Sequence, residues 1–282
     1  MTVGVVIVVA GRHDHLARTL AYLRHQTRPA DDVVVVDMAD DPATARLVDG
    51  DGRARRVTLG AAHRAPWPLA EARNAGADAV DADHLVFLDV DCIAGDDLVA
   101  SYGAAIDVHP RSLICGPVRY LRDDWLERVA WGADGRPPAG ALVAASDAPP
   151  ARTNPDDTLA AAWDHELFWS LAFGTSRQVW SELTGFDTGY VGYGAEDTDF
   201  ALRARAAGIP MRWTPDGTAF HQWHPPSRED PANHHAMAAN ACRYRRRWGS
   251  WPMLGLLRDL EQRGILRIDY DTATIDVLGG AP

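Results

Sequence analysis

Asp89 and Asp91 follow an apolar run at residues 84–88, and a single valine separates the two carboxylates. On an extended strand end, side chains two positions apart point to the same side. A hard divalent cation such as Mg²⁺ or Mn²⁺ takes oxygen ligands and often connects a carboxylate to the phosphates of a substrate. The pair therefore indicates a metal site for a phosphorylated ligand. The alternative is a polar turn that binds nothing.

His221 and His224 lie three residues apart at the end of a predicted strand, residues 218–222, and two prolines follow them. Imidazole nitrogen suits Mn²⁺ and Zn²⁺ better than Mg²⁺ or Ca²⁺. The two histidines are therefore candidate ligands for a metal, with a structural role as the alternative. Trp223 stands between them, and we interpret it either as a platform for a sugar ring or as a core residue.

Three acidic residues open a predicted helix at 196–207, directly after a glycine-rich segment: Glu196, Asp197 and Asp199. A carboxylate held near a bound hydroxyl is the usual group for removing its proton. The glycines would let the main chain approach a ligand closely. One of the three is therefore a candidate general base. The alternative is that they only stabilise the helix N-terminus as caps and through the helix dipole.

The first half of the chain alternates apolar runs with amphipathic stretches. Strands are predicted at residues 3–9, 33–36, 56–59 and 84–88, and helices at 15–25, 42–48 and 68–80. This order predicts an α/β fold with a doubly wound parallel sheet and right-handed crossovers. Ligands of such sheets bind at the carboxyl ends of the strands. Arg12, Asp37 and Asp89 all lie at those ends.

The second half has a weaker pattern. Residues 131–157 are rich in proline, glycine, alanine and aspartate without a period, which predicts a long, mobile, irregular segment and a candidate lid. Beyond it we predict helices at 178–184 and 234–248, a strand at 211–214 and a terminal hairpin at 265–278. The basic run Arg243–Arg247 is interpreted as a solvated helix face, with a phosphorylated acceptor or a membrane surface as alternatives.

Composition narrows the range of partners. The 282 residues carry 28 basic and 39 acidic side chains, a formal charge of -11, and none of the basic residues is lysine. A negative field disfavours nucleic acid and anionic membranes. The three cysteines form no C-x-x-C motif, which predicts reduced thiols and a cytoplasmic location, with the inner membrane face as an alternative. No apolar stretch approaches the roughly 20 residues that cross a bilayer, so we expect no transmembrane segment.

The order of these motifs, from about residue 3 to residue 226, resembles GT-A fold glycosyltransferases. It is similar to the family 2 glycosyltransferases together with the carboxyl-terminal region of the β-1,4-galactosyltransferases. The resemblance implies a Rossmann-like α/β fold with a mostly parallel central sheet. It implies a catalytic domain at residues 1–230, with a nucleotide-sugar half at about 1–115 and an acceptor half at about 116–230. Residues 231–282 would add a C-terminal helix and hairpin packed on the same domain.

On the donor side, the segment Ala10-Gly11-Arg12-His13 stands where the family has Pro-x-Arg-Asn, and it keeps only the arginine. The run Ala72-Arg73-Asn74-Ala75-Gly76 matches the family's Ala-Arg-Asn-x-Gly helix, whose arginine lies near the diphosphate. The resemblance assigns uracil or ribose to Asp37, although Met38-Ala39-Asp40 replaces the usual residues after it. The donor-binding residues that the resemblance implies are Ala10, Gly11, Arg12, Asp37, Arg73, Asp89 and Val90.

On the catalytic side, the run from Gly192 to Asp197 is similar to the galactosyltransferase run Gly-Trp-Gly-Gly-Glu-Asp, with tyrosine in place of tryptophan. The resemblance makes Asp197 the catalytic base and gives the acceptor to Glu196, with Tyr193 and Trp223 beside it. It makes Asp91, His224 and His221 the ligands of Mn²⁺ or Mg²⁺.

The implied reaction is metal-dependent transfer of glucose or galactose from a UDP-sugar to a hydroxyl acceptor, a saccharide or a glycolipid precursor, with inversion. One alternative is a retaining enzyme of the same fold, in which Asp197 only orients the acceptor. A second is a sugar nucleotidyltransferase, but such enzymes commonly carry a lysine after the first strand, and this chain has none. A third is a sugar-nucleotide-binding protein without catalysis, which the match of Asp91, Asp197 and His224 to the family motifs disfavours.

Overall fold

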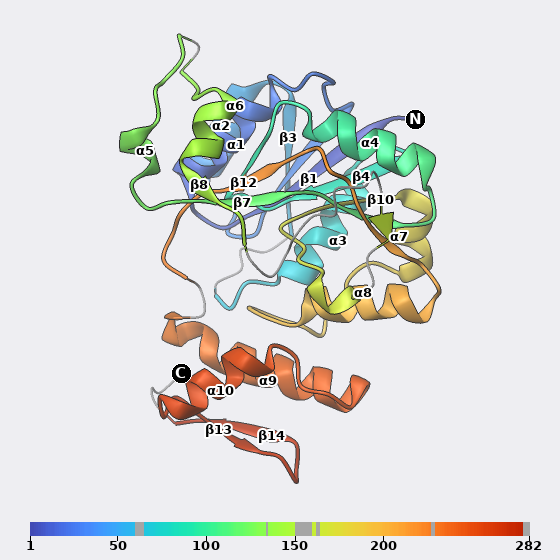
Figure 1. Ribbon diagram of the computed structural model, residues 1–282, viewed down its shortest axis with the longest axis vertical. Helices are drawn as coiled ribbons and strands as arrows, with labels where there is room; N and C mark the ends of the chain where they lie inside the picture. The colour runs from blue at the N-terminus through green and yellow to red at the C-terminus, as the bar shows by residue number, and fades with distance from the viewer. Residues whose placement is uncertain (60–64, 134, 150–159, 162–163, 227–228, 279–282) are drawn as a thin grey trace.

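The computed structural model describes residues 1–59, 65–133, 135–149, 160–161, 164–226 and 229–278. Its centre is an eight-stranded sheet with the order β3-β2-β1-β4-β10-β6-β11-β9 (Figure 1). The members are β1 (Val3–Val9), β2 (Asp32–Asp37), β3 (Ala54–Thr58), β4 (His84–Leu88), β6 (Leu113–Cys115), β9 (Ala160–Ala161), β10 (Ala172–Ser176) and β11 (Met211–Trp213). A mostly parallel α/β sheet is thus confirmed.

The parallel half of the sheet follows from its sequence. β1 is buried along its whole length, and it pairs in parallel with β2 on one side and β4 on the other. Helices cover both faces, so every residue of a central strand lies in the core, as a continuous apolar run requires. The helices of this half are α1 (His13–Leu23), α2 (Pro42–Asp51), α3 (Leu69–Ala79) and α4 (Leu98–Val108).

The second half of the sheet is mixed. β10 runs antiparallel to both of its neighbours, β4 and β6, and β9 is antiparallel to β11. The parallel order predicted from the first half of the chain is confirmed from β3 to β4. The pairing direction of a short strand is decided by the neighbours that bury it, and five residues without a period do not reveal those neighbours.

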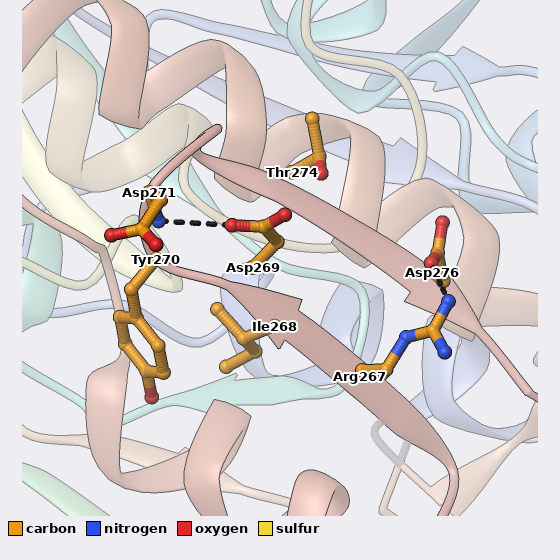
Figure 2. Close-up of a pocket in the computed structure, with 7 residues that line it drawn as sticks. All are labelled: Arg267, Ile268, Asp269, Tyr270, Asp271, Thr274 and Asp276. Carbon is orange, nitrogen blue, oxygen red and sulfur yellow. Dashed lines mark hydrogen bonds and ion pairs between the residues drawn. The ribbon is translucent and has the colours of Figure 1, made fainter.

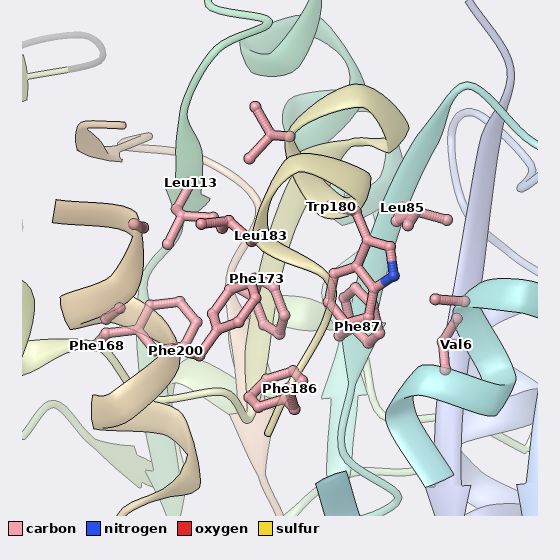
Figure 3. Packing of buried hydrophobic residues seen from close by; sticks show 14 of the residues in the cluster. Val6, Leu85, Phe87, Leu113, Phe168, Phe173, Trp180, Leu183, Phe186 and Phe200 are labelled. Atoms are coloured by element: carbon pink, nitrogen blue, oxygen red, sulfur yellow. The ribbon is translucent and has the colours of Figure 1, made fainter. Parts of the chain in front are cut away.

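A core of aromatic rings lies beneath the antiparallel half of the sheet, between the sheet and the helices α7 (Arg177–Leu183) and α8 (Glu196–Ala206) (Figure 3). The rings of Phe87 and Phe173 stack with centroids 4.5 Å apart, and those of Phe186 and Phe200 stack at the same spacing. Offset or edge contacts of this kind add to the stabilisation from burial. The core gives α8 a fixed base beneath its N-terminal turn.

A second sheet of four strands has the order β5-β12-β7-β8. Its strands are β5 (Cys92–Ala94), β7 (Val118–Leu121), β8 (Ser146–Asp147) and β12 (Ala219–His221). β5 begins directly after Asp91, and β12 pairs with it so that Cys92 lies opposite His221. This pairing brings two distant parts of the chain to one place.

The predicted irregular segment at 131–157 is partly regular in the structure. Helix α6 (Ala139–Ala144) follows the short helix α5 (Trp125–Arg128), and β8 then pairs with β7. The prediction of irregular structure is therefore wrong for residues 139–147. Residues 134 and 150–157 of the segment lie outside the described part, and the lid stays a prediction.

After β12 come the helices α9 (Pro231–Trp248) and α10 (Leu254–Gln262) and the hairpin of β13 (Leu266–Asp269) with β14 (Thr274–Val277). In Figure 1 they form a distinct group below the two sheets. α9 begins with Asp230 as its cap and Pro231 in its first turn, and it ends at Gly249 in a left-handed conformation, as helix ends favour. Among the described helices, none is long and apolar enough to span a bilayer.

Candidate active site

The chain turns sharply after β4. The Cys92 N–H donates to the Asp89 carbonyl over 2.9 Å, and the Thr19 hydroxyl donates to the Val90 carbonyl over the same distance. Residues 89–92 therefore form a turn, and the expectation of an extended strand end is wrong. Because the chain turns between them, the two carboxylates meet different partners: Asp89 bonds to Arg73, and Asp91 faces the histidines.

Asp91, His221 and His224 form the candidate metal site. Their ligand atoms all lie within 4.8 Å of one another. His224 Nε2 is 3.2 Å from one Asp91 oxygen, and His221 Nε2 is 3.6 Å from the other. Burial lowers the pKa of His221, against the opposite effect of Asp91, and this favours the neutral ring that binds metals. One carboxylate and two imidazoles are a donor set that fits Mn²⁺.

His224 is oriented by its other nitrogen. Its Nδ1 lies 2.7 Å from the Pro225 carbonyl, to which a proton on Nδ1 can donate. In that tautomer Nε2, 3.2 Å from Asp91, would be free to coordinate a metal. A metal-binding histidine usually gives its second nitrogen to a carbonyl or carboxylate in this way, so the surroundings of the ring also fit a metal ligand.

Arg12 reaches into the same cluster. It has a left-handed main chain, with φ of 51°, at the start of α1. Its guanidinium donates to Asp91 and lies 3.4 Å from His224 Nδ1. Burial alone would raise the pKa of Asp91, but His224, His221 and Arg12 together hold that pKa well below its ordinary value. The carboxylate is thus ionised and paired with a cation.

Gln222 lies between the two histidines in the chain and fastens the end of β12 to α1 and to the turn at Asp91, and the sequence pattern did not single it out. Its side chain is 1% exposed. It accepts a hydrogen bond from Arg18 at 2.6 Å and donates to the His15 carbonyl at 3.3 Å, while its main-chain N–H donates to the Asp91 carbonyl. The signal that would have found Gln222 is an amide side chain at a position, just after a strand, where the alternating pattern predicts that the side chain points inward. Trp223, the next residue, is 48% exposed, so its interpretation as a core residue is wrong.

Arg73 connects the turn after β4 to the start of α8. It is 3% exposed and donates to Asp89 at 2.9 Å and to Glu196 at 3.3 Å. Its guanidinium also lies 5.3 Å from the centre of the Phe186 ring. Burial would lower the pKa of Arg73, but Asp89 and Glu196 outweigh it and raise that pKa. The predicted contact of Arg73 with a diphosphate stays a prediction.

The neighbours of Arg73 in the run from Ala72 to Gly76 have structural roles. Asn74 donates to the Phe186 carbonyl at 2.9 Å and accepts from the Phe186 N–H at 2.8 Å. A Cβ atom on Gly76 would lie 2.3 Å from Val6 Cγ1, so only glycine lets α3 pack this closely on β1. The contacts of Asn74 and Gly76 therefore fix the position of Arg73 relative to the sheet.

Glu196 and Asp197 form the first turn of α8, which begins after Ala195 in a left-handed conformation with φ of 73°. Burial and the nearby Asp197 raise the pKa of Glu196 to about 7. One Glu196 oxygen, Oε2, is buried without a hydrogen-bond partner among the described residues. Burial also raises the pKa of Asp197, although Asp197 accepts from the Thr198 N–H at 2.7 Å. Both carboxyl groups thus hold protons more tightly than in water.

Asp199 has a structural role instead. It is fully buried and accepts from Arg203 at 3.0 Å, from Trp248 at 2.9 Å and from Tyr190 at 3.3 Å. The bond from Trp248 fastens α8 to α9, and the bond from Tyr190 fastens it to the segment before α8. The interpretation of Asp199 as a stabiliser therefore holds, and the choice of a base narrows to its two neighbours.

The other predicted donor residues lie at the carboxyl ends of β1, β2 and β4. Ala10 and Gly11 lead directly into Arg12, and the Val90 side chain is buried. Asp37 is fully buried, accepts from the N–H of Asp41 at 2.8 Å, and pairs with Arg56. Its carboxylate thus shapes the loop after β2, and its predicted contact with uracil or ribose stays a prediction.

The basic run lies on α9, as predicted, but its arginines are not simply solvated. Arg243 donates to both oxygens of Asp187 at 2.9 Å, and Arg247 donates to one of them at 3.1 Å. Arg247 also lies 3.3 Å from Asp199. The run therefore serves first to join α9 to the segment before α8.

A surface hollow on the C-terminal hairpin is shown in Figure 2. It is lined by residues of β13, β14 and the turn between them, and Asp269 closes that turn by accepting from the Asp271 N–H. None of the predicted site residues lines it. The candidate site is the separate cluster of charged groups around Asp91, Arg73 and Asp197.

Two family models match this chain. Residues 4–134 match the model described as Glycosyl transferase family 2, and residues 162–224 match the model described as the N-terminal domain of galactosyltransferase. The second falls where the galactosyltransferase resemblance was expected, although its description names the N-terminal and not the carboxyl-terminal region. Asp91 lies in the first match, and both histidines lie in the second.

Curated relatives include two validoxylamine A glucosyltransferases. One is from Streptomyces hygroscopicus subsp. limoneus, and the other is from Streptomyces hygroscopicus subsp. jinggangensis (strain 5008). Each is 28% identical over 267 residues, which is 86% of this chain. The chain spans 56% of the length of the first relative and 60% of the second.

Similar solved structures include GalNAc-T7 with UDP, GalNAc and Mn²⁺, with a TM-score of 0.62, 16% identity and coverage of 87% of this chain and 48% of the other. Another is S. aureus TarS 1-349 in complex with UDP-GlcNAc, with a TM-score of 0.60, 16% identity and coverage of 80% and 60%. The fold of the chain is therefore that of the GT-A glycosyltransferases, while residues 4–134 are similar to glycosyl transferase family 2 and residues 162–224 are similar to the galactosyltransferases.

Proposed function

We propose that this chain transfers a hexose, glucose or galactose, from a UDP-sugar to a hydroxyl acceptor, with inversion and with a divalent metal. The observation that carries the proposal is the linked cluster in which Asp91 faces two histidines while Arg73 joins Asp89 to Glu196. Support for the donor comes from neighbours solved with UDP and UDP-GlcNAc, and support for glucose comes from the relatives named as glucosyltransferases.

Asp91, His221 and His224 would hold the metal, and the two imidazoles favour Mn²⁺ over Mg²⁺. A bound divalent ion neutralises the charge that builds on the departing nucleoside diphosphate. Arg12 already brings a positive charge to Asp91. Its guanidinium can pair with phosphate oxygens in two hydrogen bonds, so it is suited to hold the diphosphate beside the metal site.

Asp197 is the proposed base. Burial raises its pKa, which makes its carboxylate a stronger proton acceptor than an exposed aspartate. It takes the proton of the acceptor hydroxyl while that oxygen forms a bond to the anomeric carbon. The bond from the anomeric carbon to the diphosphate oxygen breaks on the opposite face, and the configuration inverts. Glu196, with a pKa of about 7, is half protonated near neutral pH and can hydrogen-bond the acceptor in either state.

The acceptor would be a saccharide or a glycolipid precursor, and Tyr193 and Trp223 would contact it. Trp223 is half exposed beside the metal cluster, where its ring can stack on a sugar. We also propose that residues 1–115 bind the nucleotide sugar, that residues 116–230 bind the acceptor, and that residues 231–282 pack on the same domain. The contacts of Arg243 with Asp187 support that packing.

The test begins with a thermal-shift panel of nucleotide sugars, with and without Mn²⁺. UDP-glucose or UDP-galactose should raise the melting temperature, and more so with Mn²⁺. Asp197→Asn should keep this shift but lose transfer by about 10²- to 10⁴-fold. Asp271→Asn, at the exposed hairpin turn, is the matched control and should transfer normally. No shift with any nucleotide sugar would refute the donor assignment, and a product of retained configuration by NMR would refute inversion.

A further inference from the structure

Asn240 lies on α9, beyond the last residue matched by either family model, and its side chain is 3% exposed. Its amide meets the main chain of the segment before α8 at three points. It accepts from the Val191 N–H at 3.3 Å and donates to the carbonyls of Val191 and Tyr193 at 3.1 and 3.2 Å. A buried side chain that pairs three main-chain groups of one loop fixes the course of that loop.

The C-terminal helices hold the same loop by packing. A Cβ atom on Gly192 would lie 2.6 Å from Ala236 Cβ on α9, and one on Gly194 would lie 2.8 Å from Met253 Cε. Both glycines have positive φ, of 78° and 104°. The loop therefore lies directly against the C-terminal helices, in a main-chain conformation that residues other than glycine rarely adopt.

The course of this loop sets the position of the proposed base. After Gly194 comes Ala195 with φ of 73°, and α8 then opens with Glu196 and Asp197. A change in the course of residues 191–194 would rotate or shift this first turn. The later turns of α8 are fastened independently of the loop, because Arg203 donates to the carbonyls of Leu183 and Gly185 at 2.5 and 2.6 Å. In the first turn, Asp199 accepts from Trp248 of α9 at 2.9 Å. The position of this turn is therefore set by the loop together with α9.

We propose that Asn240 is a positioning residue for transfer: it holds the loop at 191–193 so that Asp197 meets the acceptor hydroxyl. This proposal rests on the proposed function. Asparagine suits the position because it both accepts and donates. Aspartate has the same shape, but it would place a charged oxygen against the two carbonyls. Leucine would remove all three of these hydrogen bonds.

The experiment compares the full chain with Asn240→Asp, Asn240→Leu and the control Leu260→Ala, whose buried side chain lies in the C-terminal core and makes no hydrogen bond to the loop. In Asn240→Asp we expect faster hydrogen exchange at residues 188–195 and a fall in kcat of about ten-fold. The affinity for UDP with Mn²⁺ should stay within about two-fold, since the Asp91 cluster is untouched. Asn240→Leu should show the larger effect, and Asn240→Asp decides the matter if the leucine variant does not fold.

A merely structural role predicts another result. Leu260→Ala should lower the melting temperature without changing loop exchange or kcat at temperatures below unfolding. If Asn240→Asp behaves like Leu260→Ala in both measurements, the positioning role is overturned. If loop exchange rises but the unaltered chain transfers no sugar, the proposed function fails while the loop contact stands.

Discussion

Strand pairing holds the Asp91 end of the site, whereas side chains that reach across from other elements hold the Asp197 end. At the first end, β5 and β12 pair so that Asp91 and His221 meet. At the second, Arg73 and Asn240 bond to Glu196 and to the loop before it. Main-chain hydrogen bonds between strands survive most substitutions, because they do not depend on the side chain. A hydrogen bond from a buried side chain is lost when that single residue is replaced. The comparison teaches that the acceptor end depends on single buried side chains, whereas the metal end combines main-chain pairing with one such side chain, Gln222.

The largest effect should come from removing a ligand itself. Asp91→Ala should abolish Mn²⁺-dependent binding of UDP, a loss of more than about 100-fold, because two imidazoles alone leave the cation without its only charged ligand in the cluster. Calorimetry measures this directly. Asp271→Ala is the control and should bind as the unaltered chain does. Unchanged UDP affinity in Asp91→Ala would place the metal elsewhere and break the comparison.

The next effect tests whether strand pairing alone holds the metal end. Gln222→Leu removes the bonds to Arg18 and to the His15 carbonyl while keeping a buried side chain of similar size. We expect Mn²⁺ affinity to fall by about 10- to 100-fold, as it does when groups that orient metal ligands are removed. Trp223→Leu, one residue further, should leave that affinity unchanged. Equal affinity in both variants would mean that main-chain pairing suffices.

A smaller effect is expected at the acceptor end, in the pH dependence of the free energy of unfolding. The pKa of Glu196 is raised from 4.5 to about 7 in the folded protein, so between these values the folded state keeps a proton that the unfolded state has lost. This contribution to stability is fully present below pH 4.5 and is lost as the pH rises through 7. Its size is up to about 3 kcal/mol.

Glu196→Gln cannot titrate, so its free energy of unfolding should fall less between pH 5 and pH 8 than that of the unaltered chain. Denaturant unfolding at several pH values measures the difference. Glu166→Gln, an exposed glutamate, is the control. Parallel curves for Glu196→Gln and the unaltered chain would show that the titrating group of the acceptor end is another one.

The smallest effect concerns competition at the metal end. The Arg12 guanidinium pairs with Asp91, so a metal must bind in competition with it. Arg12→Gln should therefore raise Mn²⁺ affinity in the absence of nucleotide by about two- to five-fold, and it should weaken UDP binding. Calorimetry with and without UDP separates the two effects. Arg128→Gln, on the surface, should change neither, and weaker Mn²⁺ binding in Arg12→Gln would contradict the competition.

Sequence patterns predicted the parallel half of the fold well and the rest unevenly. β1 and β4 are buried runs of large apolar residues, and α1 has a clear apolar stripe of leucines, so their pattern determines their type. β10 and α4 were missed, because β10 mixes small and polar residues without alternation and an apolar helix has no period that distinguishes it. The turn at Asp89–Cys92 was expected to be extended because its closing hydrogen bond runs between main-chain atoms, which residue types do not reveal.

By itself the sequence determined which residues are candidates for binding and catalysis. Carboxylates after an apolar run, paired histidines and an acidic helix start are local features, and local spacing is enough to find them. Only the tertiary structure decided how they are combined: that Asp91 faces both histidines, that Arg73 joins Asp89 to Glu196, and that Asn240 holds the loop before the proposed base. The physical reason is that these contacts join segments far apart in the chain, and strand pairing and core packing choose such partners together.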